Sequence, residues 1–185
     1  QGSEAVIIDP VDRQSQRDLQ QLERLNLKLT YIFETHVHAD HVTSAGRLRQ
    51  LTGAKTVVPG GCGVGMADVQ LHDGDVINFG LDEQIRVLHT PGHTAGSMSF
   101  VWRDNVFTGD ALLIDGCGRT DFQSGSAETL YDSIYKKLFT LSDATLVWPG
   151  HDYKGQSVST IGWEKRHNSR LAGRDKSDFV ELMNN

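Results

Sequence analysis

The densest group of residues able to do chemistry is the segment His36-Val37-His38-Ala39-Asp40-His41, which holds four potential metal ligands within six residues. Imidazole and carboxylate side chains together suit zinc, iron or manganese rather than calcium. Alternate residues of an extended segment project to the same side, so His36 and His38 point together, while Asp40 and His41 follow as a helix begins. This pattern predicts a metal site. The alternative is a polar loop that caps the following helix.

Three further motifs each place one more such residue directly after an expected strand. They are Pro91-Gly92-His93-Thr94, Thr108-Gly109-Asp110 and Pro149-Gly150-His151. Together with the first segment they use five of the eight histidines, and such a concentration is difficult to explain by packing alone. We therefore take the four motifs as parts of one site and expect the other histidines at the surface or the edge of the core.

The pattern of apolar residues predicts the elements that carry these motifs. We expect strands over 4–9, 29–33, 55–59 and 145–148, helices over 19–25, 45–53 and 127–139, an antiparallel meander over 69–110, and a helical tail from 160 in which Ser177 caps the last segment. The glycine-rich stretch 60–65 is expected to be a loop. Strands that alternate with helices in both halves, with no linker or repeat, predict one layered α/β domain over residues 1–185.

Composition excludes several classes of function. The chain has 185 residues and a net charge of −6, without the clustered Lys and Arg that nucleic-acid binding requires. No apolar run approaches the roughly 20 residues that span a bilayer, so we expect no membrane insertion. The only two cysteines, Cys62 and Cys117, are far apart, which fits a reducing compartment. We interpret Cys117 as a small residue filling a tight turn rather than as a thiol that carries sulfur in a reaction, and we favour a small-molecule substrate.

The motifs, taken in order, resemble those of the metallo-β-lactamase superfamily. The residues that carry the resemblance are His36, His38, Asp40, His41, His93, Asp110 and His151. The resemblance implies an αββα sandwich with its metal site along one edge. Two segments, Gly-Asp-Ala-Leu-Leu-Ile at 109–114 and Gly-Cys-Gly-Arg-Thr-Asp-Phe-Gln at 116–123, are similar to the persulfide dioxygenase family. Glyoxalase II enzymes share the Gly-Cys-Gly-Arg part but continue differently and carry a separate helical domain.

The resemblance to the dioxygenases implies the reaction and the metal. One Fe(II) per chain would be bound by His36, His93 and Asp110, and the terminal sulfur of glutathione persulfide would be oxidised by O₂ to give sulfite and glutathione, a step of sulfide oxidation. His38, Asp40, His41 and His151 would orient the ligands through hydrogen bonds.

Two other functions stay open at this point. Spacing alone favours a dinuclear hydrolase, because all the ligands that superfamily members use to hold two metals are present. The main alternative is therefore a hydroxyacylglutathione hydrolase of the glyoxalase II kind. A non-catalytic metal or redox sensor on the same scaffold is a further alternative, which the complete ligand motifs disfavour.

Substrate contacts are predicted at three positions. Arg119 could bind a glutathione carboxylate, because its planar fork suits carboxylates, or it could form an ion pair that holds its loop. Thr94 and Tyr153 lie close to motif histidines and could donate hydrogen bonds to the substrate or brace the ligands.

The resemblance also bears on the chain's boundaries and surroundings. Family members usually begin with another strand and end with a short extension, so we expect the chain to be trimmed at both ends. A homodimer and a rhodanese partner or fused rhodanese domain are compatible with the family. For location, the bacterial cytoplasm is preferred to the mitochondrial matrix.

Overall fold

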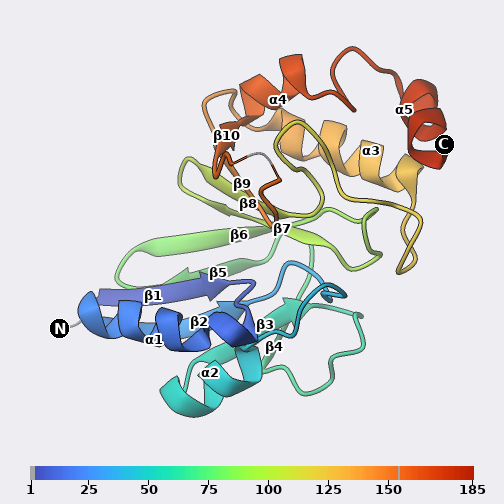
Figure 1. The fold of residues 1–185 in the computed structure, drawn as a ribbon. Helices are drawn as coiled ribbons and strands as arrows, with labels where there is room; N and C mark the ends of the chain where they lie inside the picture. The colour runs from blue at the N-terminus through green and yellow to red at the C-terminus, as the bar shows by residue number, and fades with distance from the viewer. Residues whose placement is uncertain (1–2, 154) are drawn as a thin grey trace.

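The computed structural model describes residues 3–153 and 155–185. Two β-sheets pack face to face, with helices α1 and α2 against the outer face of one sheet and helices α3, α4 and α5 against the outer face of the other (Figure 1). This is the predicted αββα sandwich. Among the described residues, no helix is both long enough and apolar enough to cross a bilayer.

The first sheet contains four parallel strands in the order β1-β2-β3-β4. Its strands are β1 (Ser3–Ile8), β2 (Leu27–Phe33), β3 (Lys55–Pro59) and β4 (Val69–Leu71), and its helices are η1 (Asp12–Gln14), α1 (Ser15–Arg24) and α2 (Ala45–Thr52). The expected antiparallel meander over 69–110 is wrong at its first strand, because Val69 pairs in parallel with Val57. Turn residues mark where a strand ends, whereas the partner that a strand finds depends on tertiary packing.

The second sheet has six strands in the order β10-β9-β8-β7-β6-β5. Its strands are β5 (Val76–Phe79), β6 (Glu83–His89), β7 (Met98–Trp102), β8 (Asn105–Gly109), β9 (Leu146–Pro149) and β10 (Ser159–Thr160), and the helices beside it are α3 (Ala127–Lys136), η2 (Leu138–Thr140), α4 (Ile161–His167) and α5 (Lys176–Asn184). All its pairings are antiparallel except the parallel pair β8 and β9.

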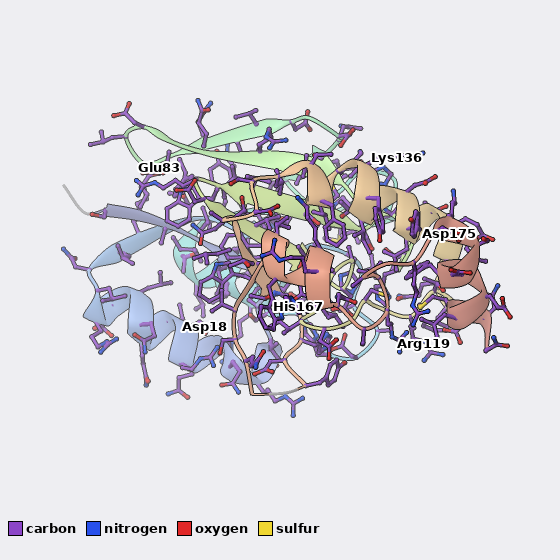
Figure 2. The ribbon with its side chains drawn as sticks, turned by 90° about the horizontal axis from the view of Figure 1, so that it is seen from above. Asp18, Glu83, Arg119, Lys136, His167 and Asp175 are labelled. Carbon is purple, nitrogen blue, oxygen red and sulfur yellow. The ribbon has the colours of Figure 1, made fainter. Side chains whose placement is uncertain are left out.

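One predicted helix cap is wrong. Asp175, labelled at the start of α5 in Figure 2, is the N-cap, and its side chain accepts a hydrogen bond from the backbone N–H of Asp178. Ser177 lies inside the helix and donates its hydroxyl to the Asp175 carboxylate over 2.7 Å. Both residue types cap helices well, so composition alone did not distinguish the two positions.

The core between the sheets sets their relative position. Phe33 and Val57 from the first sheet pack with Val87 and Phe100 from the second, and all four are fully buried. The rings of Phe33 and Phe100 meet edge to face, with centroids 5.1 Å apart. Burial of four large apolar side chains stabilises this contact by about 1.5–3 kcal/mol each. The contact lies directly before the exit of β2, where the first metal-ligand motif begins.

Gly92 places the second motif against a helix. Its φ is +134°, and a Cβ at this position would lie 2.3 Å from the Cα of Leu130 in α3. The carbonyl oxygen of Gly92 accepts the backbone N–H of Ser126 over 2.8 Å, and that of Pro91 accepts the hydroxyl of Ser133 over 2.7 Å. The loop that carries His93 is therefore fixed in van der Waals contact with α3.

We expect Gly92→Ala to lower the free energy of unfolding by about 3 kcal/mol, because the added methyl group meets helix backbone and the φ angle disfavours any side chain. Urea unfolding followed by circular dichroism measures this difference. Gly46→Ala is the matched control, since a Cβ at Gly46 meets nothing within 4 Å. Equal unfolding midpoints for the two variants would contradict the close packing described here.

Candidate metal centre

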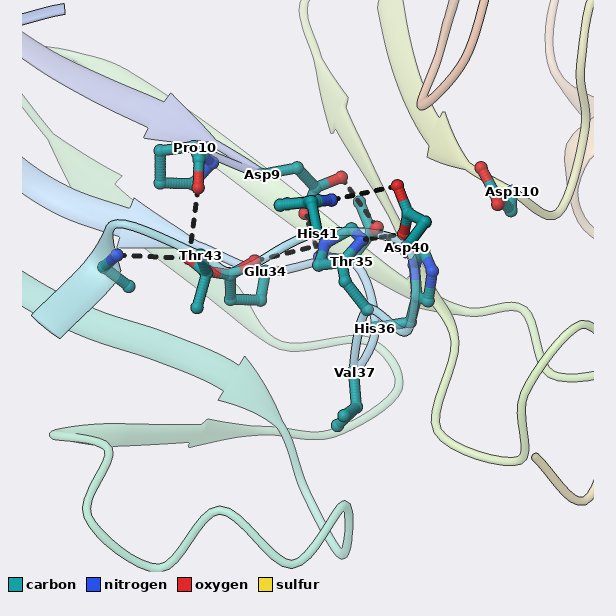
Figure 3. A network of polar contacts seen from close by, with 12 residues as sticks. Asp9, Pro10, Glu34, Thr35, His36, Val37, Asp40, His41, Thr43 and Asp110 are labelled. Atoms are coloured by element: carbon teal, nitrogen blue, oxygen red, sulfur yellow. Dashed lines mark hydrogen bonds and ion pairs between the residues drawn. The ribbon is translucent and has the colours of Figure 1, made fainter. Parts of the chain in front are cut away.

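The predicted metal ligands gather where strands of both sheets end. His36 follows β2, His93 follows β6, Asp110 follows β8 directly, and His151 follows β9. Figure 3 shows the first motif leaving β2 with its imidazole and carboxylate groups turned toward one another and toward Asp110. The packing of the two sheets therefore brings together residues that are more than 100 positions apart in the sequence.

Three of these residues form a compact group. Ligand atoms of His36, His93 and Asp110 all lie within 4.8 Å of one another. Nε2 of His93 lies 3.6 Å from Oδ2 of Asp110, and the rings of His36 and His93 stand at 87° with centroids 5.0 Å apart. Both histidines are buried, with 3% and 9% of their surface exposed.

Hydrogen bonds leave the same nitrogen free on both histidines. Nδ1 of His93 lies 2.8 Å from the carbonyl oxygen of Arg119, which can only accept, so Nδ1 carries the proton. Nδ1 of His36 lies 2.9 Å from the hydroxyl oxygen of Thr35, which donates its own hydrogen to Oδ2 of Asp9 over 2.8 Å. That oxygen therefore accepts from His36. In both rings the lone pair of Nε2 is left for a metal.

The protonation of His36 suits a metal ligand. Burial, with the nearby charge of His38 as the second cause, lowers the pKa of His36 to about 4. The imidazole is therefore neutral at physiological pH. A neutral imidazole is the form that binds a metal, so no proton needs to leave this ring first.

His38 is held by two carboxylates. Its Nε2 lies 3.1 Å from Oδ1 of Asp9 and 3.2 Å from Oε2 of Glu34. Burial alone would lower the pKa of His38, but the hydrogen bonds and charges of Asp9 and Glu34 outweigh it and raise the pKa to about 10. Burial also raises the pKa of Glu34, whose other oxygen accepts the hydroxyl of Thr43. Nδ1 of His38 is buried and has no hydrogen-bond partner within the described part of the chain.

His151 connects the first group to a second one. Its Nδ1 lies 2.8 Å from Oδ1 of Asp110, and its Nε2 lies 3.1 Å from Oδ2 of Asp40. The same Asp40 oxygen lies 3.0 Å from Nδ1 of His41. Burial opposes the effect, yet the bonds from His41 and His151 hold the pKa of Asp40 well below its usual range. His38, Asp40 and His41 also place ligand atoms within 4.8 Å of one another.

The donors fit a metal ion. Nε2 of His41 is buried without a hydrogen-bond partner in the described residues, and a buried polar atom without a partner costs about 1–3 kcal/mol. Ligand atoms of His36, His93 and Asp110 converge, and the hydrogen bonds at Nδ1 leave Nε2 of both histidines free. Two imidazoles and one carboxylate are a ligand set for a divalent transition metal.

Sequence reasoning missed two residues of the site, Asp9 and Glu34. Asp9 ends the first β-branched run directly before Pro10, and Glu34 directly precedes the Thr-His pair of the first motif. The rule that found His93, a polar residue at a strand exit, would have found Asp9 as well. A lone carboxylate at a strand end is common, however, so this feature alone does not distinguish a site residue.

The predicted substrate contacts occupy different places. The guanidinium of Arg119 forms a two-point ion pair with Asp121, at 2.7 and 2.8 Å, as the loop-holding alternative requires. Thr94 is buried, and its hydroxyl lies 2.8 Å from that of Ser97, which braces the loop after His93. Tyr153 is 77% exposed and stacks on His151, with ring centroids 5.5 Å apart. Contact of these side chains with a substrate stays a prediction.

Comparison with known proteins places this geometry in a family. The sequence model of the metallo-beta-lactamase superfamily matches residues 1–61 and 64–151. The mitochondrial persulfide dioxygenase ETHE1 of Bos taurus is 47% identical over 99% of this chain and 72% of its own length. The crystal structure of ETHE1 from Myxococcus xanthus superposes with a TM-score of 0.96 at 53% identity, covering 98% of this chain and 80% of that one. The chain belongs to the persulfide dioxygenase family of the metallo-β-lactamase superfamily.

The persulfide dioxygenase family is matched more completely than the hydrolases. A hydroxyacylglutathione hydrolase from Tolumonas auensis is 37% identical over 86% of this chain, and the match spans 61% of the hydrolase. The dioxygenase relatives thus agree over more of both partners and at higher identity. Membership confirms the predicted fold, and the superfamily implies that the site binds a metal.

We expect Asp9→Asn to weaken metal binding by about ten- to a hundredfold, because Asp9 orients His36 through Thr35 and contacts His38 directly. Asparagine has the same shape and tolerates the positive φ of this position, so the fold should persist. Competition with a chelator, followed by metal analysis, measures the affinity. Asp82→Asn, in an exposed turn, is the matched control. Unchanged metal affinity in the Asp9 variant would show that metal binding does not depend on the contacts of Asp9 with Thr35 and His38.

We expect only one of the two cysteines to react in the native protein. Cys117 is 6% exposed, and burial raises the pKa of its thiol to about 11, so very little thiolate exists at pH 8. Cys62 is only partly buried. Titration with a disulfide reagent at pH 8 should count one thiol per native chain and two in urea, and none in native Cys62→Ser. Rapid modification of native Cys117 would refute this prediction and revive its interpretation as a persulfide carrier.

Proposed function

We propose that this protein is a glutathione persulfide dioxygenase that works with one Fe(II) per chain. The observation that carries the proposal is the group of His36, His93 and Asp110, whose ligand atoms lie within 4.8 Å of one another while hydrogen bonds at Nδ1 leave Nε2 of both histidines free. The persulfide dioxygenase relatives, similar over nearly the whole chain, supply the substrate class. Two imidazoles and a carboxylate on one face are also the ligand set of non-haem iron oxygenases.

The proposed reaction balances without an amino-acid nucleophile. Glutathione persulfide, O₂ and water give glutathione, sulfite and two protons. The S–S bond breaks, and the terminal sulfur gains two oxygen atoms from O₂ and one from water. Four electrons pass from that sulfur to O₂, so no other oxidant or reductant is needed. Bound iron would supply an accessible change of oxidation state, which zinc lacks.

The chain's own residues have separate tasks in this proposal. His36 and His93 would bind the metal through Nε2, because their Nδ1 protons are held by Thr35 and by the Arg119 carbonyl. His151 holds one carboxylate oxygen of Asp110 and so fixes which oxygen faces the histidines. His38, kept protonated by Asp9 and Glu34, has an N–H at Nδ1 that can stabilise negative charge on the sulfur being oxidised.

A second candidate function is hydrolysis of a glutathione thioester with two metals. It is favoured by the separate group of His38, Asp40 and His41, whose ligand atoms also converge, and by the likeness to a hydroxyacylglutathione hydrolase. In that case these residues would bind the second metal instead of orienting the first. Metal count and oxygen use distinguish the two functions.

We expect protein reconstituted with Fe(II) under anaerobic conditions to consume O₂ when glutathione persulfide is added, with one sulfite formed per O₂ and about one iron per chain. An oxygen electrode, sulfite assay and metal analysis measure these quantities. Asp110→Asn should lose at least about a hundredfold in rate, because it removes the negative ligand, whereas Asp104→Asn, in an exposed turn, should not. Two metals per chain, no oxygen uptake and cleavage of a thioester would instead establish the hydrolase.

A further inference from the structure

A pocket of about 390 Å³ lies beside the metal centre, and neither the proposed reaction nor the relatives' names account for it. It is bounded by α2, the end of β3 and the loop that joins β3 to β4, and its lining includes His36, His38 and His41. Pockets of this size hold small organic molecules. The imidazoles around the metal site thus also form a wall of this second space.

The mouth of the pocket is apolar, although Glu34, Gln50 and three imidazoles also line it. Val37, Val64 and Met66 line it although 41%, 39% and 90% of their surfaces are exposed to solvent. Figure 3 shows Val37 pointing away from Asp9 and the carboxylate cluster. Exposed apolar side chains gathered at the mouth of one pocket mark a binding surface more often than an accident of folding.

The one arginine that lines the pocket does not offer an unpaired charge. Both Nε and Nη2 of Arg49 bind the carboxylate of Asp68, over 2.8 and 2.7 Å. Glutathione carries two carboxylates and an ammonium group, and moving unpaired charges into an apolar pocket is costly. The pocket therefore fits an apolar organic group and not the charged ends of glutathione.

We infer that this pocket binds the organic group of persulfides whose thiol is apolar, so that the enzyme has a second substrate class beside glutathione persulfide. The inference rests on the proposed function. The reaction is unchanged: the S–S bond breaks, O₂ and water supply three oxygen atoms to the terminal sulfur, and the apolar thiol leaves. An apolar group in the pocket keeps the attached sulfur beside the histidines that line its wall.

The side chain at position 46 determines how much space the pocket has for such a group. It lies in the first turn of α2 and lines the pocket, and a Cβ there would meet nothing within 4 Å. A leucine at this position can extend into the empty space without displacing backbone. Gly46→Ala adds one methyl group to the same site and leaves most of the space open, so it controls for the change in helix propensity.

The test compares two substrates on the iron-loaded enzyme. For benzyl persulfide, kcat/KM should fall about tenfold or more in Gly46→Leu, because the leucine side chain fills space that the apolar group needs. It should stay near the wild-type value in Gly46→Ala, because a Cβ at this position meets nothing within 4 Å. For glutathione persulfide, kcat/KM should be unchanged in both variants. An equal loss of kcat/KM for both substrates in Gly46→Leu would overturn the inference, and so would a rise in KM for O₂ with both substrates. Failure of the wild-type enzyme to oxidise benzyl persulfide would overturn it as well.

Binding without turnover gives a second readout. Benzyl methyl sulfide, which has no terminal sulfur to oxidise, should bind wild type and Gly46→Ala in isothermal titration and should not bind Gly46→Leu. Absence of binding to wild type would overturn the inference even if glutathione persulfide is oxidised normally. If neither persulfide supports oxygen uptake while the sulfide still binds at the pocket, the proposed function fails and the pocket's apolar preference stands.

Discussion

The carboxylate of Asp9 is the contact on which the geometry of the centre depends. It accepts the backbone N–H and the hydroxyl of Thr35, over 2.7 and 2.8 Å, and contacts Nε2 of His38 at 3.1 Å. One side chain at the end of β1 therefore fixes the backbone after β2, the tautomer of His36 and the ring of His38. Asp9 has a φ of +51°, an unfavourable conformation for most residues, which its hydrogen bonds offset.

The geometry of the centre also depends on two glycines, Gly109 and Gly150, whose lack of a side chain allows close approach. Gly109 has a φ of +50°, and a Cβ there would lie 2.5 Å from the hydroxyl oxygen of Thr35. Because glycine has no side chain, the exit of β8 can approach the exit of β2 closely enough to place Asp110 beside His36. Gly150 repeats this at the exit of β9, where a Cβ would lie 2.7 Å from Oδ1 of Asp110. The strand exits can thus approach one another closely at the centre, because no glycine side chain stands between them.

The motifs that contain His36, His93 and Asp110 could be recognised from the sequence, because their residue types and their positions at strand exits are local features. Spacing alone favoured two metals, and only the resemblance to the persulfide dioxygenases singled out these three residues as the ligands of one iron. Asp9 and Glu34 could not be identified as site residues from the sequence, because a single carboxylate beside a strand is common. Their role depends on contacts with Thr35 and His38 that form only in the folded protein. The parallel pairing of β4 and the capping of α5 by Asp175 failed for a similar reason. In both cases the sequence allows two arrangements equally well, and the tertiary structure decides which one forms.

The arrangement around His38 and His41 matches the physical nature of a persulfide. These imidazoles line the pocket whose lining also includes Val37 and Met66. They also line a smaller pocket of about 250 Å³, whose other lining residues include Asp40 and Arg13. A persulfide is charged or polarisable at its sulfur and of variable polarity at its organic group. A site whose imidazoles line both an apolar space and a polar space can hold the sulfur in one place while the organic group occupies the space that suits it.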